Sequence, residues 1–148
     1  MAKKINFQIV TPEKVIFEDM IDSVTMPTQM GEITVLPNHI PLVSVLVAGE
    51  LRLKKDNQEI PMAVSGGFIE VQNNKVVILA DTAERVEEID EKRAEEARVR
   101  AKDILKEKRV DSEEFASISA KIEKELARLR VARKYRPRRE TPYQTKEE

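Results

Sequence analysis

Residues 75–97, KVVILADTAERVEEIDEKRAEEA, decide the fold class, because they pass abruptly from branched apolar residues to alanine and charged residues. Valine and isoleucine are enriched in strands, whereas Ala, Glu, Lys and Arg are strong helix formers. From Thr82 to Lys134 the chain contains neither glycine nor proline. We therefore predict β-structure before this transition and helices after it.

The apolar residues before the transition recur with a period near two. Ile5, Phe7 and Ile9 alternate with polar residues, and runs such as EITVL, PLVSVL and GELRLK follow, separated by Pro, Gly and Asn. Such alternation is typical of half-buried strands, and turns favour the residues between the runs. The glycines of VSGGFIEV are assigned to a tight turn or bulge, since no phosphate-binding loop motif follows them. This half is predicted to form a β-sandwich or barrel.

Two stripes of apolar residues at three-to-four spacing predict two helices after the transition. The first stripe is Ala94, Ala97, Ala101, Ile104 and Leu105, and the second is Phe115, Ile118, Ile122, Leu126 and Leu129. Between the stripes, Asp111 or Ser112 is placed to cap the second helix. The prediction is an antiparallel αα-hairpin.

The predicted hairpin has a seam made mostly of alanine. Such a seam buries little apolar area against the conformational entropy of the ordered residues. We therefore expect the hairpin to need a support, either the β-domain or a partner, and two supports allow two conformations. Acidic residues crowd the start of the first helix and basic residues the end of the second, which suits an antiparallel arrangement.

The composition excludes several classes of function. The 148 residues include 26 basic and 27 acidic side chains, so the net charge does not favour binding to nucleic acid or an anionic membrane. With no cysteine and one histidine, the chain lacks ligands for a thiolate zinc site or an imidazole cluster, and no metal site is expected. No signal peptide and no run of roughly 20 apolar residues is found, so a cytosolic chain is expected. No nucleophile has an evident base, so no catalytic centre is expected.

The basic run RLRVARKYRPRRE, residues 128–140, leaves two interpretations open. With Tyr135 it could clamp phosphates and stack a base, as in a small nucleic-acid-binding β-barrel with a basic helical arm. It is also typical of a solvated helix end followed by a disordered tail, broken at Pro137.

Four segments, in order and spacing, make the chain similar to a known family. GEITVLPNHIPLV, AVSGGFIEVQNNKVVILADTAER, IDEKRAEEA and LARLRVA resemble the epsilon subunit of bacterial F-type ATP synthases along nearly the whole chain. The resemblance implies a ten-stranded N-terminal β-sandwich followed by a C-terminal antiparallel two-helix hairpin. The expected domains are residues 1–84 and 85–134, with a charged tail, 135–148, that is expected to be disordered.

The resemblance also implies a function. The sandwich would bind the gamma subunit and the ring of c subunits in the rotating central stalk, coupling them for proton-driven ATP synthesis at the cytoplasmic face of the cell membrane. The hairpin would fold onto the sandwich or extend toward the alpha/beta catalytic head and restrain ATP hydrolysis. The chain would be a non-catalytic subunit that requires no cofactor, with ATP as a regulatory ligand in those family members that bind it.

The segment IDEKRA, residues 89–94, satisfies the pattern of family members that bind ATP. The resemblance carries the site over to Glu84, Asp90, Arg93, Ala94, Arg100 and Arg128. A second arginine of the pattern, four residues before Arg128, is Lys124 here, which keeps the charge but loses bidentate phosphate geometry. From the residues alone, an ordinary ion pair between Asp90 and Arg93 beside an alanine seam explains the same spacing.

The resemblance assigns partner contacts to two further groups. Glu32 would lie near the polar loops of the c ring and His39 near the gamma subunit, whereas the alternatives are a turn residue and a satisfied hydrogen-bond donor. The basic end of the second helix would face either the acidic start of the first helix or an acidic surface of the catalytic beta subunits. This basic end consists of Arg128, Arg130, Arg133 and Lys134.

Overall fold

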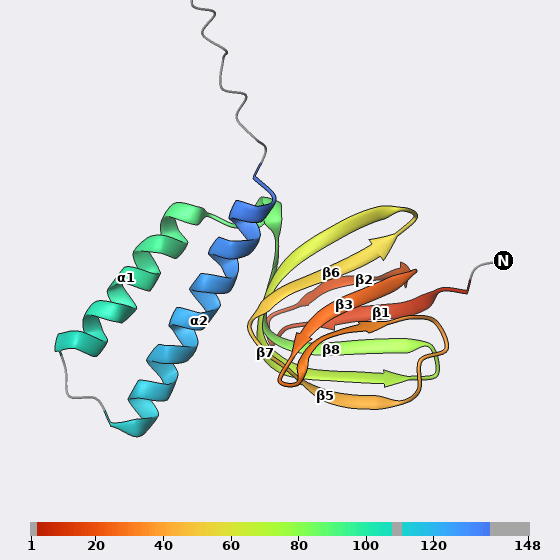
Figure 1. Cartoon of the computed structure of the whole chain (residues 1–148), viewed down its shortest axis with the longest axis horizontal. Coiled ribbons are helices and arrows are strands. Elements are labelled where there is room, and N and C mark those ends of the chain that lie inside the picture. Colours follow the sequence, from red (N-terminus) through yellow and green to blue (C-terminus); the bar gives the residue numbers. More distant parts are fainter. Residues whose placement is uncertain (1–2, 108–110, 137–148) are drawn as a thin grey trace, which may run out of the picture.

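The computed structural model describes residues 3–107 and 111–136 and shows a β-domain followed by two helices (Figure 1). The strands are β1 (Ile5–Val10), β2 (Val15–Ile21), β3 (Ser23–Thr28), β4 (Gly31–Val35), β5 (Leu42–Leu46), β6 (Gly49–Lys55), β7 (Gln58–Gln72) and β8 (Lys75–Arg85). A short 3-10 helix, η1 (Val86–Glu88), leads to α1 (Glu91–Glu107) and α2 (Ser112–Lys134). The predicted change from strands to helices is confirmed.

The strands form one continuous hydrogen-bonded path that folds into the two layers of a sandwich. The path runs β2-β1-β8-β7-β5-β3-β4, and β6 pairs with both β3 and β7. Strand β7 belongs to both layers, because its first part pairs with β6 and its second part with β5. Strand β8 follows β7 along its length and also pairs in parallel with β1.

Strand β7 passes between the layers at Gly66 and Gly67, which have φ values of +43° and +138°. A Cβ atom on Gly67 would lie 1.9 Å from the carbonyl oxygen of Leu79, so glycine is required there. The pairing of β7 with β8 keeps one register through this bend. The expectation of ten strands is therefore wrong: the described residues contain eight, because β7 and β8 each continue through the bend instead of ending at it.

The hydrophobic core lies between the two layers. Ile5, Phe7 and Ile9 of β1 are at most 1% exposed, and the residues between them point outward. In β6, Leu51 and Leu53 are fully buried and alternate with polar side chains. The period-two prediction is confirmed, since each strand presents its apolar set to the interior.

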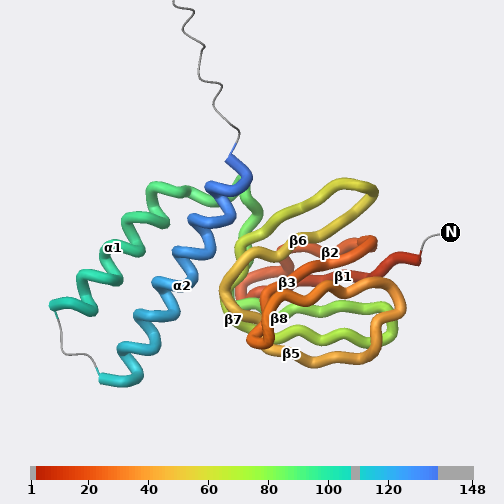
Figure 2. The backbone as a smooth tube through the Cα atoms, viewed as in Figure 1, coloured from red at the N-terminus to blue at the C-terminus, as the bar shows by residue number. Residues whose placement is uncertain are grey.

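The two helices lie side by side, with α2 between α1 and the sandwich (Figures 1 and 2). Asp111, one of the two predicted caps, is the N-cap of α2, where its Oδ1 accepts the backbone N–H of Glu114 at 2.8 Å. Helix α2 contacts β6 and β7. The hairpin therefore rests on the β-domain, which is one of the two supports that the alanine seam requires.

Burial in the hairpin is concentrated where α2 meets the sheet. The buried residues of α2 are Glu125, Ala127, Leu129, Val131 and Ala132, all in its second half. By contrast, Phe115 in its first turn is 55% exposed, and in α1 only Ala94 and Ala101 are buried. The predicted stripes thus bury only part of their apolar area.

Candidate docking surfaces and hairpin contacts

An apolar row crosses one outer face of the sandwich. Val45 of β5 pairs with Phe68 of β7, and Phe68 pairs with Leu79 of β8, so the three side chains lie beside one another. They are 38%, 59% and 56% exposed, and nearby Val43 is 75% exposed. Exposed apolar side chains that gather on neighbouring strands mark a surface that a partner can cover.

The loop between β4 and β5 leads directly into this apolar row. Leu36 and Ile40 in the loop are exposed. His39 is half-buried, and its Nδ1 lies 2.7 Å from the carbonyl oxygen of Ile40. Because a carbonyl only accepts, Nδ1 carries the proton and Nε2 is left as an acceptor. His39 thus has a satisfied donor, and the apolar surface at this loop comes from its neighbours.

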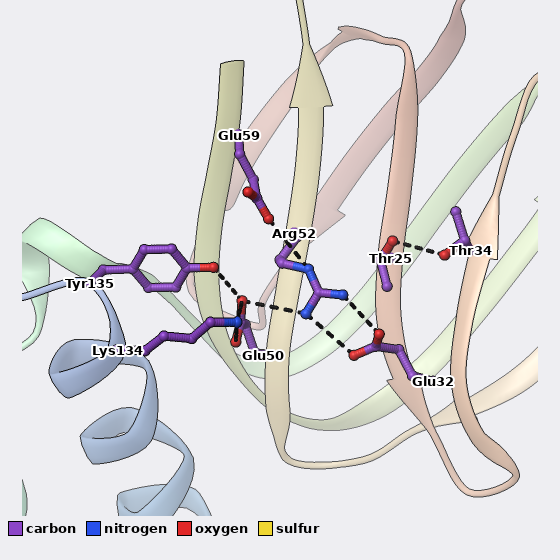
Figure 3. A network of polar contacts seen from close by, with 8 residues as sticks. All are labelled: Thr25, Glu32, Thr34, Glu50, Arg52, Glu59, Lys134 and Tyr135. Atoms are coloured by element: carbon purple, nitrogen blue, oxygen red, sulfur yellow. Dashed lines mark hydrogen bonds and ion pairs between the residues drawn. The ribbon is translucent and has the colours of Figure 1, made fainter. Parts of the chain in front are cut away.

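The other layer carries a polar network centred on Arg52 of β6 (Figure 3). Glu32 of β4 accepts two hydrogen bonds from the guanidinium, from Nη2 at 2.7 Å and from Nη1 at 3.3 Å. Glu50 and Glu59 lie 3.5 and 3.4 Å from other guanidinium nitrogens. Glu32, predicted to contact a partner, therefore lies in a strand and not in a turn, and its side chain remains 53% exposed.

Glu50 joins this network to the end of α2 (Figure 3). Lys134 Nζ donates to both carboxylate oxygens, at 3.1 and 2.9 Å, and the Tyr135 hydroxyl donates to Oε1 at 2.5 Å. Burial acts to raise the pKa of Glu50, but these hydrogen bonds outweigh it and hold the pKa below its ordinary 4.5. Burial and the nearby carboxylate raise the pKa of Tyr135, so its hydroxyl keeps the proton it donates. Lys134 thus pairs with the sheet and not with α1.

Arg128 connects α2 to strand β8. Its Nε and Nη2 donate to the two carboxylate oxygens of Glu84 at 2.6 and 3.1 Å, and its Nη1 donates to Glu125 at 2.7 Å. The side chains of Arg128 and Glu125 are only 16% and 10% exposed. Loss of one partner would leave a nearly buried charge uncompensated. The structure therefore brings together two of the predicted nucleotide residues, Glu84 and Arg128.

The other predicted nucleotide residues lie around the start of α1. Asp90 caps this helix, because its Oδ1 accepts the backbone N–H of Arg93 at 3.1 Å. Ala94 is fully buried, whereas Arg93 and Arg100 are exposed. In residues 3–107 and 111–136, no ion pair joins Asp90 to the Arg93 guanidinium, and no contact joins either exposed arginine to Arg128. The predicted set is divided into a buried pair, a cap, a seam alanine and two exposed cations.

The basic end of α2 lies beside the acidic start of α1, as expected for an antiparallel hairpin. Arg133 lies 3.8 Å from Glu91 and 3.7 Å from Glu95, and Arg136 hydrogen-bonds to Glu91. Arg130 is exposed and has no carboxylate within ion-pair distance among the residues that the structure describes. The four basic residues therefore face three different surroundings.

A cavity of about 400 Å³ lies beside Glu84, between the β-domain and α2. Its charged lining consists of Lys14, Arg85 and Lys124, together with Glu13, Asp81, Glu84 and Glu88. Lys124, which stands where the family pattern has arginine, thus lies near the Glu84–Arg128 pair. The cavity can admit a ligand to this pair, although its lining carries both signs of charge.

Glu50, Arg52 and Tyr135 were not identified as a connected group from the sequence. The alternation in GELRLK indicates that Glu50 and Arg52 point away from the core. Their contact with Tyr135, however, joins residues 85 positions apart, and no local pattern carries that information.

Two families of domain match the chain, one on each side of the transition. Residues 4–86 match the family described as ATP synthase, Delta/Epsilon chain, beta-sandwich domain. Residues 87–133 match the family described as ATP synthase, Delta/Epsilon chain, long alpha-helix domain. The ATP synthase epsilon chain of Trichlorobacter lovleyi is 42% identical over 134 residues, which are 90% of this chain and 97% of the relative. The chain belongs to the ATP synthase epsilon family.

Other members and solved structures agree with this assignment. The epsilon chain of Chloroflexus aggregans is 45% identical over 135 residues, covering 91% of this chain and 96% of the relative. A chain in the mitochondrial ATP synthase of Euglena gracilis, from a structure of OSCP, F1 and c-ring, has a TM-score of 0.67 and 25% identity, covering 81% of this chain and 76% of that one. A chain in the central stalk and c-ring of Tetrahymena thermophila shares the fold, with a TM-score of 0.61, 15% identity and coverage of 90% and 98%.

Membership of the epsilon family makes this chain a non-catalytic subunit of a rotary ATP synthase complex. The resemblance found in the sequence is confirmed. The alternative of a nucleic-acid-binding module has no support from these relatives. Three of the basic residues that it would use, Arg128, Arg133 and Lys134, already lie next to carboxylates.

Proposed function

We propose that this chain joins the gamma subunit to the c ring in the central stalk, so that rotation is transmitted without slip during ATP synthesis. The apolar row of Val45, Phe68 and Leu79 carries this proposal, because it offers an exposed face on a domain whose core is already complete. Subunit interfaces are built around such apolar centres with polar rims. The gamma subunit would cover this face beside His39.

The c ring would contact the chain at Glu32, whose half-exposed carboxylate suits polar loops. The chain would then lie at the cytoplasmic face of the cell membrane, held there through the ring. Within the described residues, no helix has both the length and the apolar composition needed to cross a membrane.

The gamma contact is tested by placing a charge in the apolar row. Phe68→Asp should prevent co-purification of the chain with the gamma subunit from reconstituted complex, because the new carboxylate would be buried without a partner. Phe115→Asp is the matched control, since Phe115 is 55% exposed against 59% for Phe68 but lies in the first turn of α2. Equal recovery of gamma with both variants would exclude the apolar row as the contact.

The hairpin would restrain ATP hydrolysis by extending toward the catalytic head. Two features support this role: the small buried area of α2, and basic residues that an acidic partner surface can take from the carboxylates of α1. Deletion of the chain from Glu88 onward should leave assembly and proton pumping intact and raise the steady-state hydrolysis rate. An unchanged rate would remove the inhibitory role, and loss of pumping would show that coupling also needs the hairpin.

ATP would act as a regulatory ligand that stabilises the folded hairpin. Its phosphates would replace the carboxylates on Arg128, with Lys124 beside the cavity and the exposed Arg93 and Arg100 as further cations. At a hundredfold excess over the dissociation constant, a ligand stabilises the bound form by about 2.7 kcal/mol. Thermal melts with and without ATP should show this shift in the wild type and in the control Arg130→Ala, but not in Arg93→Ala. Identical melts of the wild type would exclude the site.

A further inference from the structure

One carboxylate oxygen of Glu50 is shared by donors from two parts of the molecule. Oε1 accepts the Tyr135 hydroxyl at 2.5 Å and Lys134 at 3.1 Å, both from the end of α2. The same oxygen lies 3.5 Å from Nη1 of Arg52, a distance at the limit of hydrogen bonding. Figure 3 shows the two helix side chains and the guanidinium approaching Glu50 from opposite sides.

The position of Arg52 is set by competition between its acidic neighbours. Glu32 holds both terminal nitrogens of the guanidinium, with Nη1 to Oε2 at 3.3 Å and Nη2 to Oε1 at 2.7 Å. Nη1 is therefore drawn toward Glu32 and away from Glu50. If Glu32 lost its charge or turned to another cation, Nη1 would be free to approach Glu50 Oε1, which Tyr135 needs.

We propose that Glu50, Lys134 and Tyr135 form a clasp that holds the end of α2 on the sheet, and that Arg52 makes the strength of this clasp depend on what occupies Glu32. A partner loop that presents a lysine or arginine to Glu32 would release Arg52 toward Glu50 and loosen α2. The docking surface around Glu32 would thereby be coupled to the hairpin across β4, β3 and β6. The identity of that partner rests on the proposed function, whereas the coupling itself is a property of the isolated chain.

The clasp is tested by amide hydrogen exchange of the full-length isolated chain at neutral pH. Tyr135→Phe and Glu50→Gln should speed exchange in the last turn of α2 by roughly tenfold or more, the effect of losing a hydrogen bond to a charged group. Protection of the β-strand amides serves as the internal check that each variant is folded. Unchanged exchange in α2 with either variant would overturn the clasp.

The coupling is tested by removing the charge from Glu32. Glu32→Gln should speed exchange in the last turn of α2 by roughly two- to fivefold, the range that half-exposed ion pairs correspond to. Glu59→Gln is the matched control, because Glu59 is 55% exposed against 53% for Glu32 and contacts Arg52 at Nε, away from Glu50. This control removes the same charge and should leave exchange unchanged.

The double variant decides whether Arg52 carries the effect. With Arg52→Gln in place, adding Glu32→Gln should have no further effect on α2, because the competing cation is gone. An effect of Glu32→Gln that persists without Arg52, or that Glu59→Gln reproduces, would overturn the coupling. Because no other subunit is present in these measurements, their outcome is independent of whether the chain binds gamma or the c ring as proposed.

Discussion

The sandwich and the hairpin of this chain are held together by different interactions. In the sandwich, large apolar side chains such as Phe7, Leu51 and Ile78 are fully buried between two layers. In the hairpin most buried residues are alanines, and ion pairs such as Arg128 with Glu84 contribute to its contact with the β-domain. Burial of a large apolar side chain contributes about 1.5–3 kcal/mol, whereas an exposed ion pair contributes about 0–1 kcal/mol and depends on pH and salt. One chain thus combines a stable platform with an element that little free energy can move.

The largest effect is expected in the core of the sandwich. Phe7→Ala should lower the free energy of unfolding by about 3–5 kcal/mol, because it removes a fully buried ring and leaves a cavity. Urea denaturation followed by circular dichroism measures this loss. Phe115→Ala, at a residue that is 55% exposed, should change the free energy by less than about 0.5 kcal/mol. Comparable losses in the two variants would contradict the comparison.

A smaller effect is expected where α2 is buried. Leu129 is 2% exposed, and Leu129→Ala should weaken the docked hairpin by about 2 kcal/mol, at the low end for buried leucines because the thin seam can relax. Hydrogen exchange should become faster throughout α2 while the β-strand amides keep their protection. Equal loss of protection in strands and helices would show that the two parts unfold as one unit.

Acid should loosen the end of α2 before it affects the sandwich. Since the pKa of Glu50 is lowered in the folded chain, its contribution is present above the ordinary value of 4.5 and is lost as pH falls through the folded value. Lys134 and Tyr135 keep their protons throughout this range, because their pKa values are raised. Amide exchange of α2, corrected for intrinsic rates, should rise several-fold below about pH 4. In Glu50→Gln this acid-dependent part should be smaller, and an identical profile would exclude Glu50 as its source.

The smallest effect is expected on removing the hairpin altogether. Strand β8 ends at Arg85, so a fragment of residues 1–86 keeps every strand and the whole core. Its free energy of unfolding should differ from that of the sandwich in the full chain by no more than about 1 kcal/mol, because only half-exposed pairs are lost. Cooperative melting and dispersed amide signals would support this expectation. A fragment without dispersed signals would show that the sandwich depends on α2.

Local patterns in the sequence were sufficient to predict the elements of this fold. Alternation places Phe7 and Leu51 inside whatever sheet forms, because successive side chains of a strand point to opposite faces. Helix propensity and the absence of glycine and proline predict the hairpin, and Asp111 caps α2 because its side chain acts within one turn. The four family motifs likewise lie in contiguous segments, so the assignment to the epsilon family was available before the fold.

Interactions between residues far apart in the chain were decided only by the tertiary structure. The count of eight strands, not ten, depends on β7 and β8 keeping one register through the bend at Gly67, which is a property of their pairing. Asp90 could pair with Arg93 or cap α1, and the angle at which the chain leaves β8 selected the cap. The contact of Glu50 with Tyr135 exists because α2 folds back onto β6, which brings together side chains that no spacing in the sequence relates. Local propensities act within a few residues, whereas the placement of α2 on the sheet depends on the packing of the whole chain.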